Sequence, residues 1–300
     1  MSVPVAYLAV ILIWSTTPLA IKWSGEGPGF LFGVLGRMTL GLLVALAVLA
    51  VLRKKLPWNR EAVQTYLAAS VGVYGAMMCV YWGAQQIPSG IVAIVFGLAP
   101  ILTSLFAHAM LKERSFTPSK VSGMLLGLAG LLVIFGDGLR FGPHGVAGIE
   151  IVLLGVLFHA LSTVLVKRTN HSLPGITVTS GALVLTTPLF LITWFVFDGV
   201  QPVNLPTAAI GSIVYLSIVG SVVGFSLYFF VLRHVTAGAV ALVPLISPVL
   251  ALILGAVVNH EDLGASVWIG AAFVLAGLAM HQWGGAVSRL MPVRLGARRE

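Results

Sequence analysis

Long apolar runs separated by short polar connections dominate the pattern of the sequence. A helix that spans a bilayer needs roughly 20 mostly apolar residues, which matches the length of these runs. Strands of a membrane barrel would alternate apolar and polar positions, and segments such as 151–158 do not alternate. The pattern therefore predicts an all-α integral membrane protein with ten transmembrane helices, near residues 3–21, 30–52, 63–86, 89–111, 119–136, 148–166, 177–197, 209–232, 237–258 and 265–284.

The composition leaves little room for a soluble domain. Of the 300 residues, 58% are hydrophobic and 9% are charged. The one cysteine, Cys79, excludes an intrachain disulfide and a multi-cysteine metal site. No basic residue precedes Lys22, so we expect the first run to be a retained helix and not a signal peptide. The expected partners are the lipid bilayer and a small-molecule substrate, with no cofactor and no metal.

The basic residues indicate the orientation of the chain. A net charge of +8 would suggest nucleic acid in a soluble protein, but these residues cluster at the ends of the apolar runs. With ten helices, all 17 Lys and Arg fall on loops of one face except Lys22, Arg140 and Arg37. The positive-inside rule then places both termini in the cytoplasm, together with a basic tail, 286–300.

The two halves of the sequence resemble each other. Residues 89–113 align without gaps with 237–261, and seven of the 25 pairs are identical, including Pro100 with Pro248 and Glu113 with Glu261. A nearby offset pairs the first run with the sixth. Each repeat therefore holds five helices, 1–136 and 148–285, and an odd number makes the second copy inverted. Inverted repeats are typical of alternating-access transporters, whose substrate site lies near the midplane between the repeats. The further pairs are Trp14 with His159, Thr17 with Ser162, Lys22 with Lys167, and Tyr81-Trp82 with Phe229-Phe230.

Several of these motifs, in their order and spacing, resemble a known family. They are Trp14-Ser15, Arg37, the run from Ser89-Gly90 through Pro100 to Lys112-Glu113-Arg114, and its copy from Ala237-Gly238 through Pro248 to His260-Glu261. On these residues the chain resembles the drug/metabolite transporter superfamily, in its ten-helix form with two EamA-type repeats, to about residue 285. More narrowly, it is similar to the bacterial aromatic amino-acid exporters of that superfamily. The resemblance implies a multi-pass protein of the bacterial inner membrane, with helices 1, 3, 4, 6, 8 and 9 around a central cavity.

Aromatic and methionine side chains form stripes on two of the predicted helices. Tyr74, Met78 and Tyr81 share one face of the third, and Phe225 and Tyr228 share one face of the eighth. They predict a pocket that stacks on flat or apolar solutes and repacks for several of them. The alternative is that these residues are interfacial anchors and ordinary packing.

Polar side chains at bilayer depth give further candidates. Polar groups there are costly unless they are paired or face a wet cavity, which makes Trp14, Ser15, His159 and Ser162 candidates for substrate binding. His159 is either a cavity group that hydrogen-bonds or titrates, or a neutral imidazole bonded to a neighbouring helix. Arg37 is a secondary candidate, because it either snorkels, pairs with a backbone carbonyl, or binds a substrate carboxylate.

Prolines and glycines inside the runs predict helix breaks and close contacts. Pro100, Pro244 and Pro248 occupy corresponding places in the two halves, where they either mark a gate or shape the bundle statically. Gly123 and Gly127 allow close helix approach, either within the chain or in a dimer.

Two other classes of function are weighed against transport. The sequence has no paired intramembrane aspartates and no His-Glu-x-x-His, and His159 with Ser162 lacks a third orienting group, so we expect no catalytic residues. The second class is an ion channel, and the sequence shows neither a filter-like loop nor a charged ring. The leading hypothesis is an alternating-access exporter of neutral, especially aromatic, amino acids and related metabolites. The alternative is a multidrug or other metabolite exporter. The exact solute, proton coupling, homo-oligomerisation and the resting conformation stay open.

Overall fold

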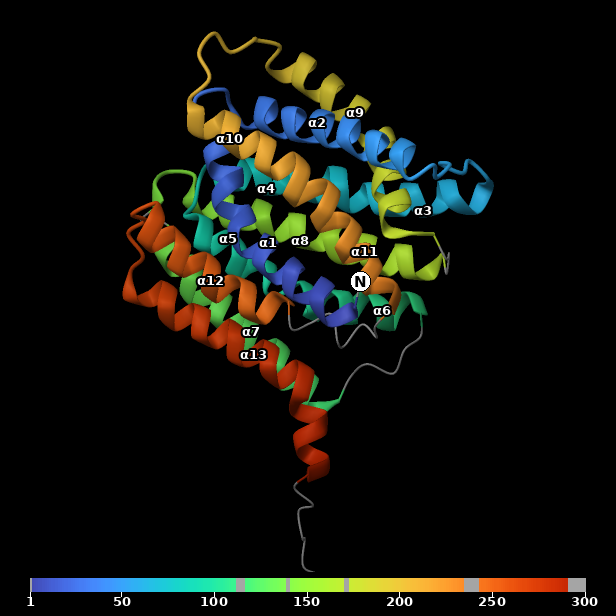
Figure 1. Cartoon of the computed structure of the whole chain (residues 1–300). Coiled ribbons are helices and arrows are strands. Elements are labelled where there is room, and N and C mark those ends of the chain that lie inside the picture. The colour runs from blue at the N-terminus through green and yellow to red at the C-terminus, as the bar shows by residue number, and fades with distance from the viewer. Residues whose placement is uncertain (1, 112–116, 139–140, 170–172, 235–242, 291–300) are drawn as a thin grey trace, which may run out of the picture.

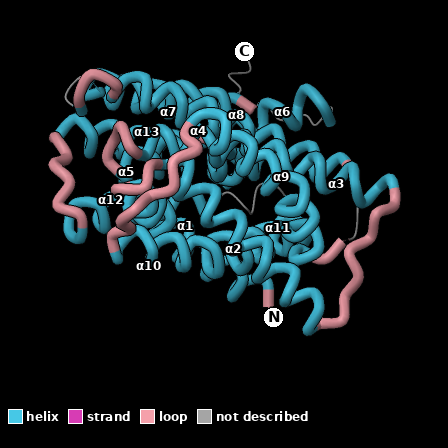
Figure 2. Tube along the Cα trace, turned by 90° about the horizontal axis from the view of Figure 1, so that it is seen from above, coloured by secondary structure: helices cyan, strands magenta, loops and turns pink. Residues whose placement is uncertain are grey.

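The fold is all-helical over the residues that the structure, a computed structural model, describes: 2–111, 117–138, 141–169, 173–234 and 243–290, with side chains left aside at 137–138, 243–245 and 282–290. Figures 1 and 2 show the arrangement of the helices. The elements are α1 (Val3–Gly25), α2 (Phe30–Val51), α3 (Arg60–Ser70), η1 (Val71–Ala76), α4 (Met77–Ala84), α5 (Ser89–Phe96), α6 (Ala99–Leu111), α7 (Pro118–Gly138), α8 (Gly145–Arg168), α9 (Gly175–Phe197), α10 (Thr207–Tyr215), η3 (Leu216–Val223), α11 (Gly224–His234), α12 (Val243–Val258) and α13 (Ala265–Leu290).

The described helices fit the predicted membrane spans closely. Eight helices, or directly joined groups of helices, are long and apolar enough to cross a membrane. Two shorter apolar stretches, Ile246–Val258 and Ala265–His281, fall where the ninth and tenth spans are predicted. The prediction of an all-helical membrane protein therefore agrees with the structure, while ten crossings remain a proposal.

The helices pack around a central pair of elements, α8 and α1. Helix α8 packs on η1, α4 and α6, and α1 lies between α10–α11 and α12. Helices α2 and α9 pack together along one side of the molecule, and α7 and α13 pack together on the opposite side (Figure 1). Among the largest fully buried side chains are Arg37, Tyr66, Tyr81 and Phe190. A charged side chain is therefore part of the interior.

Two π-helical segments interrupt the third and eighth predicted spans. They are η1 and η3, each continuous with α-helix on both sides. The sequence repeat superposes η1 partly on η3, so the irregularity recurs at a corresponding place in each half. Such segments are rare and occur frequently at functional sites. The sequence repeat predicts the small residues there but not the π geometry.

Helices α7 and α13 meet through glycine. A Cβ atom built on Gly123 would lie 2.5 Å from the carbonyl oxygen of Gly277, and one built on Gly130 would lie 2.5 Å from that of Gly270. We call these four residues the glycine seam. Only glycine allows this approach of backbone to backbone. Of the two alternatives for Gly123, the structure therefore shows the contact within the chain.

The prolines act differently in the two halves. The fourth predicted span is divided at Gly97–Leu98, directly before Pro100, into α5 and α6. Helix α12 instead runs through Pro248, so a break at that residue is wrong. Proline has no backbone N–H, so Pro248 cannot donate to the carbonyl of Pro244 in the first turn of α12. The helix therefore loses a single hydrogen bond near its start. The side chain of Pro244 lies outside the described residues.

Candidate functional site

Four aromatic side chains from four elements meet in the middle of the bundle. The ring of His159 on α8 lies 5.8 Å from that of Trp14 on α1, 5.5 Å from that of Tyr228 on α11 and 5.8 Å from that of Phe96 on α5. Trp14 and Tyr228 are 5.1 Å apart. We call these four residues the aromatic cluster. It brings together three of the residues that the sequence predicts for substrate binding.

The aromatic cluster is partly polar and partly open. Tyr228 is buried, while Trp14, Phe96 and His159 are half-buried. The hydroxyls of Tyr228 and Thr163 share a hydrogen bond of 2.7 Å, which fixes the Tyr228 ring. Rings at these separations offer faces and edges to a further aromatic group or to a cation. The arrangement therefore presents aromatic faces and edges beside a few hydrogen-bonding groups.

The predicted stripe on the third span does not join the aromatic cluster. The Tyr74 hydroxyl shares a 2.6 Å hydrogen bond with that of Thr193 on α9, and the Tyr74 ring lies 4.9 Å from Phe190. Met78 is half-buried against the hydrophobic core. Tyr74 therefore packs toward α9 and not on the rings around His159.

Two predicted serines use their hydroxyls within the backbone framework. Ser15 donates to the carbonyl of Ile11 in its own helix at 2.7 Å, and Ser162 donates to the carbonyl of Ala68 at 2.7 Å. Both are buried. The Ser162 hydroxyl thus joins α8 to α3 and is not bonded to His159.

Arg37 and Tyr81 form a second polar centre with residues of the eighth span. The Arg37 Nε donates to the Ser221 Oγ at 2.9 Å, and its guanidinium carbon lies 5.9 Å from the Tyr81 ring centre and 5.7 Å from that of Phe225. Its Nη1 also contacts the Met77 Sδ at 3.8 Å. Arg37 is 1% exposed, so it does not snorkel out of the bundle. We call these five residues the Arg37 group.

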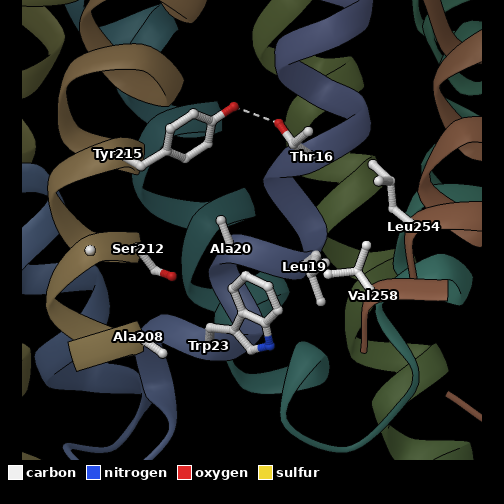
Figure 3. A pocket seen from close by; sticks show the side chains of 10 residues that line it. Thr16, Leu19, Ala20, Trp23, Ala208, Ser212, Tyr215, Leu254 and Val258 are labelled. Carbon is white, nitrogen blue, oxygen red and sulfur yellow. Dashed lines mark hydrogen bonds between the residues drawn. The ribbon is translucent and has the colours of Figure 1, made fainter. Parts of the chain in front are cut away.

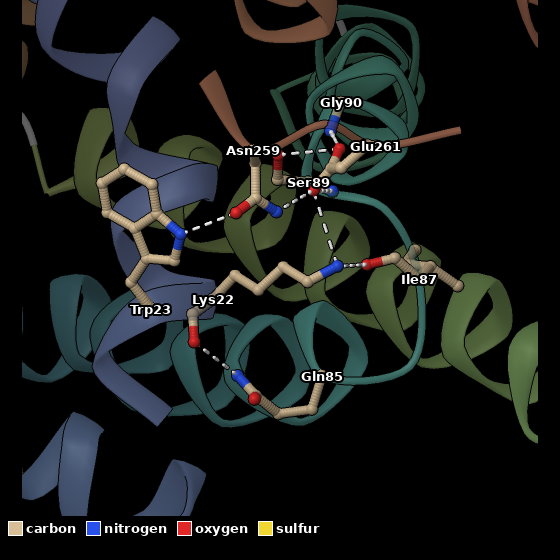
Figure 4. Close-up of polar contacts among 8 residues, drawn as sticks. All are labelled: Lys22, Trp23, Gln85, Ile87, Ser89, Gly90, Asn259 and Glu261. Atoms are coloured by element: carbon tan, nitrogen blue, oxygen red, sulfur yellow. Dashed lines mark hydrogen bonds and ion pairs between the residues drawn. The ribbon is translucent and has the colours of Figure 1, made fainter. Parts of the chain in front are cut away.

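A polar network connects α1, α5 and the segment after α12 (Figure 4). The Glu261 carboxylate accepts from the backbone N–H and the hydroxyl of Ser89 at 2.9 and 3.1 Å, and from the Asn259 amide at 3.1 Å. Lys22 Nζ lies 3.5 Å from the same carboxylate, and the Trp23 indole donates to Asn259 at 2.8 Å. We call these five residues the Glu261 network. It joins α1 and the start of α5 to the segment after α12.

The sequence contains a signal for the Glu261 network that the choice of candidate site residues does not use. Glu261 with Glu113, and Lys22 with Lys167, recur in register in the two halves. Phe96 carries no comparable signal, because apolar and small residues surround it, whereas Thr163 lies in the polar stripe of the sixth run together with His159 and Ser162.

A pocket of about 430 Å³ lies beside α1, facing α10 and α12 (Figure 3). A 2.5 Å hydrogen bond between the hydroxyls of Thr16 and Tyr215 crosses its wall. The pocket is mostly apolar and does not contain the predicted site residues. Its lining consists of Thr16, Leu19, Ala20, Trp23, Ala208, Gly211, Ser212, Tyr215, Leu254 and Val258. Among the described residues, no three His, Cys, Asp or Glu side chains are placed to hold a metal ion.

Comparison with known proteins finds similar transporters along most of the chain. It is 27% identical to the uncharacterized transporter YoaV of Bacillus subtilis, over 91% of this chain and 94% of that one. It is 25% identical to the uncharacterized inner membrane transporter YedA of Escherichia coli K12, over 96% and 93%. A probable terminal-alkyne amino-acid exporter of Streptantibioticus cattleyicolor is 27% identical over 92% and 91%.

A solved crystal structure shares the fold, with a TM-score of 0.67 and 22% identity, covering 95% of this chain and 99% of the other. The model of the EamA-like transporter family matches the sequence twice, at residues 2–136 and 146–281. Together these matches cover nearly the whole chain, in two tandem parts. The chain belongs to the EamA-like transporter family.

Proposed function

We propose that this chain exports neutral, especially aromatic, amino acids and related small metabolites across the bacterial inner membrane. The observation that carries this proposal is the aromatic cluster, because its rings come from both halves of the chain and meet in mid-bundle. A site shared by two halves can face either side of the membrane as the halves move. The relative named as a probable terminal-alkyne amino-acid exporter supports the substrate class.

The proposed route needs two halves of opposite orientation. The glycine seam supports this arrangement, since Gly123 contacts Gly277 while Gly130 contacts Gly270. The order of these contacts is that of two antiparallel helices, and α7 and α13 are the last helices of the two predicted repeats. The family model also matches each half separately. With the basic loops inside, both termini lie in the cytoplasm.

Alternating access also requires an end that opens and closes. The Glu261 network joins elements of both halves, and its contacts are hydrogen bonds and one ion pair. Such contacts can exchange for water without breaking a packed core. In the proposed orientation this end faces outward, and opening there would require the contacts of the Glu261 network to break.

The charge of the site distinguishes the proposed substrate from the alternative. A multidrug exporter of cations would be expected to place a carboxylate beside the bound cation. No Asp or Glu belongs to the aromatic cluster or to the Arg37 group. A solute without net charge fits these surroundings better than a cation does.

The test is counterflow of radiolabelled phenylalanine, threonine and a cationic dye in proteoliposomes, with and without a pH gradient. Saturable amino-acid flux without dye flux supports the proposal, and Trp14→Ala should reduce it at least tenfold, because a stacking face is lost. Leu12→Ala is the matched control, since Leu12 on the same helix is 62% exposed. Flux of the dye alone, or equal loss in both variants, would overturn the assignment.

A further inference from the structure

Arg37 is a buried cation with few partners. It is the eighth residue of α2, and its guanidinium bonds to one hydroxyl and one thioether. Within the described part of the chain, no carboxylate lies within 4.0 Å of its nitrogen atoms. A guanidinium carries five N–H donors, and a thioether is a weak acceptor. Most of the hydrogen-bonding capacity of this charge is therefore not used by acceptors of the protein.

The hydrogen bonding of the Tyr81 hydroxyl, beside Arg37, is also unsatisfied. Tyr81 is fully buried, and among the described residues its hydroxyl makes no hydrogen bond of good geometry, although the Arg37 guanidinium and the Ser24 hydroxyl face it. Buried hydroxyls in native proteins are nearly always bonded, so an unbonded one calls for a ligand or another explanation. The Tyr81 ring centre lies 5.9 Å from the Arg37 guanidinium carbon. The hydrogen-bond donors that the two side chains leave unused are therefore close enough to bind the same ligand group.

The surroundings favour an anion of small size over a bulky one. The backbone of η3 approaches Arg37 so closely that a Cβ atom on Gly220 would lie 3.2 Å from its Nη2. Phe225 covers the guanidinium from α11 at 5.7 Å. A carboxylate is planar, accepts two parallel N–H bonds from a guanidinium, and accepts a further bond from a phenol. It matches the donors that Arg37 and Tyr81 leave open.

This centre lies next to the aromatic cluster. Phe225, which contacts Arg37, precedes Tyr228 of the cluster by three residues on α11. This spacing is about one helical turn, roughly 5 Å along the axis. In an aromatic amino acid the carboxylate is separated from the ring by three covalent bonds, a comparable span. One molecule can therefore reach both places.

We propose that Arg37 and Tyr81 form a subsite for the substrate carboxylate, so that the transported solute must carry a carboxylate beside its apolar or aromatic tail, as a neutral amino acid does. This inference rests on the proposed function and restricts it. Arg37 holds the carboxylate through two N–H groups, Tyr81 donates its hydroxyl proton to it, and the aromatic cluster takes the side chain. An aromatic amine without a carboxylate is excluded, because it would leave the buried guanidinium without a counter-charge.

The test compares three ligands that differ in their charged groups: phenylalanine, 3-phenylpropionate and phenethylamine. Binding is measured on the purified full chain by calorimetry, and transport by counterflow. The wild type should bind the two carboxylates and not the amine. Arg37→Gln should weaken both carboxylates by about 10- to 100-fold, the range for a lost hydrogen bond to a charged group. Tyr81→Phe should weaken them less, and Arg60→Gln, an exposed control, should leave them unchanged.

Each outcome decides between the two proposals. If Arg37→Gln binds carboxylates as the wild type does, or the wild type prefers phenethylamine, the subsite is refuted. If Arg37→Gln does not fold, Tyr81→Phe decides, since unchanged binding of both carboxylates in that variant refutes the subsite. If the wild type binds 3-phenylpropionate, Arg37→Gln weakens that binding, and no amino acid is transported, the subsite is supported and amino-acid export is refuted. If phenylalanine and phenethylamine are transported equally well, amino-acid export is supported and the subsite is refuted.

Discussion

Replacing Glu261 by glutamine tests whether the Glu261 network holds one end of the transporter closed. The amide has the shape of the carboxylate, so the fold of the segment is retained. It loses the negative charge that faces Lys22 at 3.5 Å, and one of its two ends becomes a donor that opposes the Ser89 or Asn259 donors. The substitution therefore weakens the contact between the halves without creating a cavity.

The expected magnitude follows from the burial of the network. The Glu261 side chain is 4% exposed and that of Lys22 is 23% exposed, so solvent screens the pair only partly. One hydrogen bond to a charged group contributes about 1.5–3 kcal/mol, and the charge at the start of α5 contributes about 0.3–1 kcal/mol. A loss of about 2 kcal/mol shifts the opening equilibrium roughly 30-fold.

Thiol labelling measures this shift, since the chain has a single cysteine, Cys79, which is buried. In a Cys79→Ser background, a cysteine introduced by Phe96→Cys lies at the far end of α5 from Ser89. A membrane-impermeant thiol reagent added from the Glu261 side should label it roughly 30-fold faster once Glu261→Gln is present. Asp262→Asn is the control, because Asp262 is the neighbouring exposed acid. A wild-type rate in Glu261→Gln, or an equal increase in Asp262→Asn, would refute the reasoning.

Three further substitutions test the packing and the site. Gly123→Ala should lower the melting temperature, since overpacking costs about 1–3 kcal/mol, whereas Gly136→Ala, with no atom within 4 Å, should not; equal melting temperatures would contradict the seam. Ser162→Ala should cost about 1 kcal/mol of stability and leave the KM for phenylalanine unchanged, and a raised KM would return Ser162 to the site. Tyr228→Phe, which loses only the bond to Thr163, should reduce counterflow a few-fold while keeping the stacking face; unchanged flux would remove that hydroxyl from the site.

The helices could be predicted from the sequence because hydropathy alone sets them. The predicted run 63–86 is observed as helix over Arg60–Ala84, and 148–166 as Gly145–Arg168. In a bilayer every backbone polar group must be satisfied within its own segment, so an apolar run of this length has few alternatives to a helix. The division before Pro100 also follows from local chemistry, while the continuity of α12 depends on where in the helix Pro248 falls.

The candidate site could be predicted in part. The pairing of Trp14 with His159 by the repeat anticipated residues that meet at 5.8 Å. Tyr74 and Tyr81, which an α-helical pattern places on one face, have different neighbours in the structure: Tyr74 lies within η1 and contacts α9, while Tyr81 follows η1 and lies beside Arg37. A π-helical segment bonds i to i+5 and so rotates the residues after it relative to an α-helical pattern. Periodicity also does not tell which neighbouring helix covers a given face, so the contact of Tyr74 with α9 could not be predicted.

In the proposed alternating-access cycle, the glycine seam would restrict how the two halves move. With backbone against backbone at Gly123 and Gly277, sliding α7 along α13 would bring side chains such as Ile134 and Phe273 onto the glycine positions. Such steps would separate the helices, so rotation about the seam is the motion that keeps the contact. The axis then lies at one edge of the molecule, and displacement grows with distance from it. Helices α2 and α9, on the opposite side in Figure 1, would travel farthest, and α2 carries Arg37.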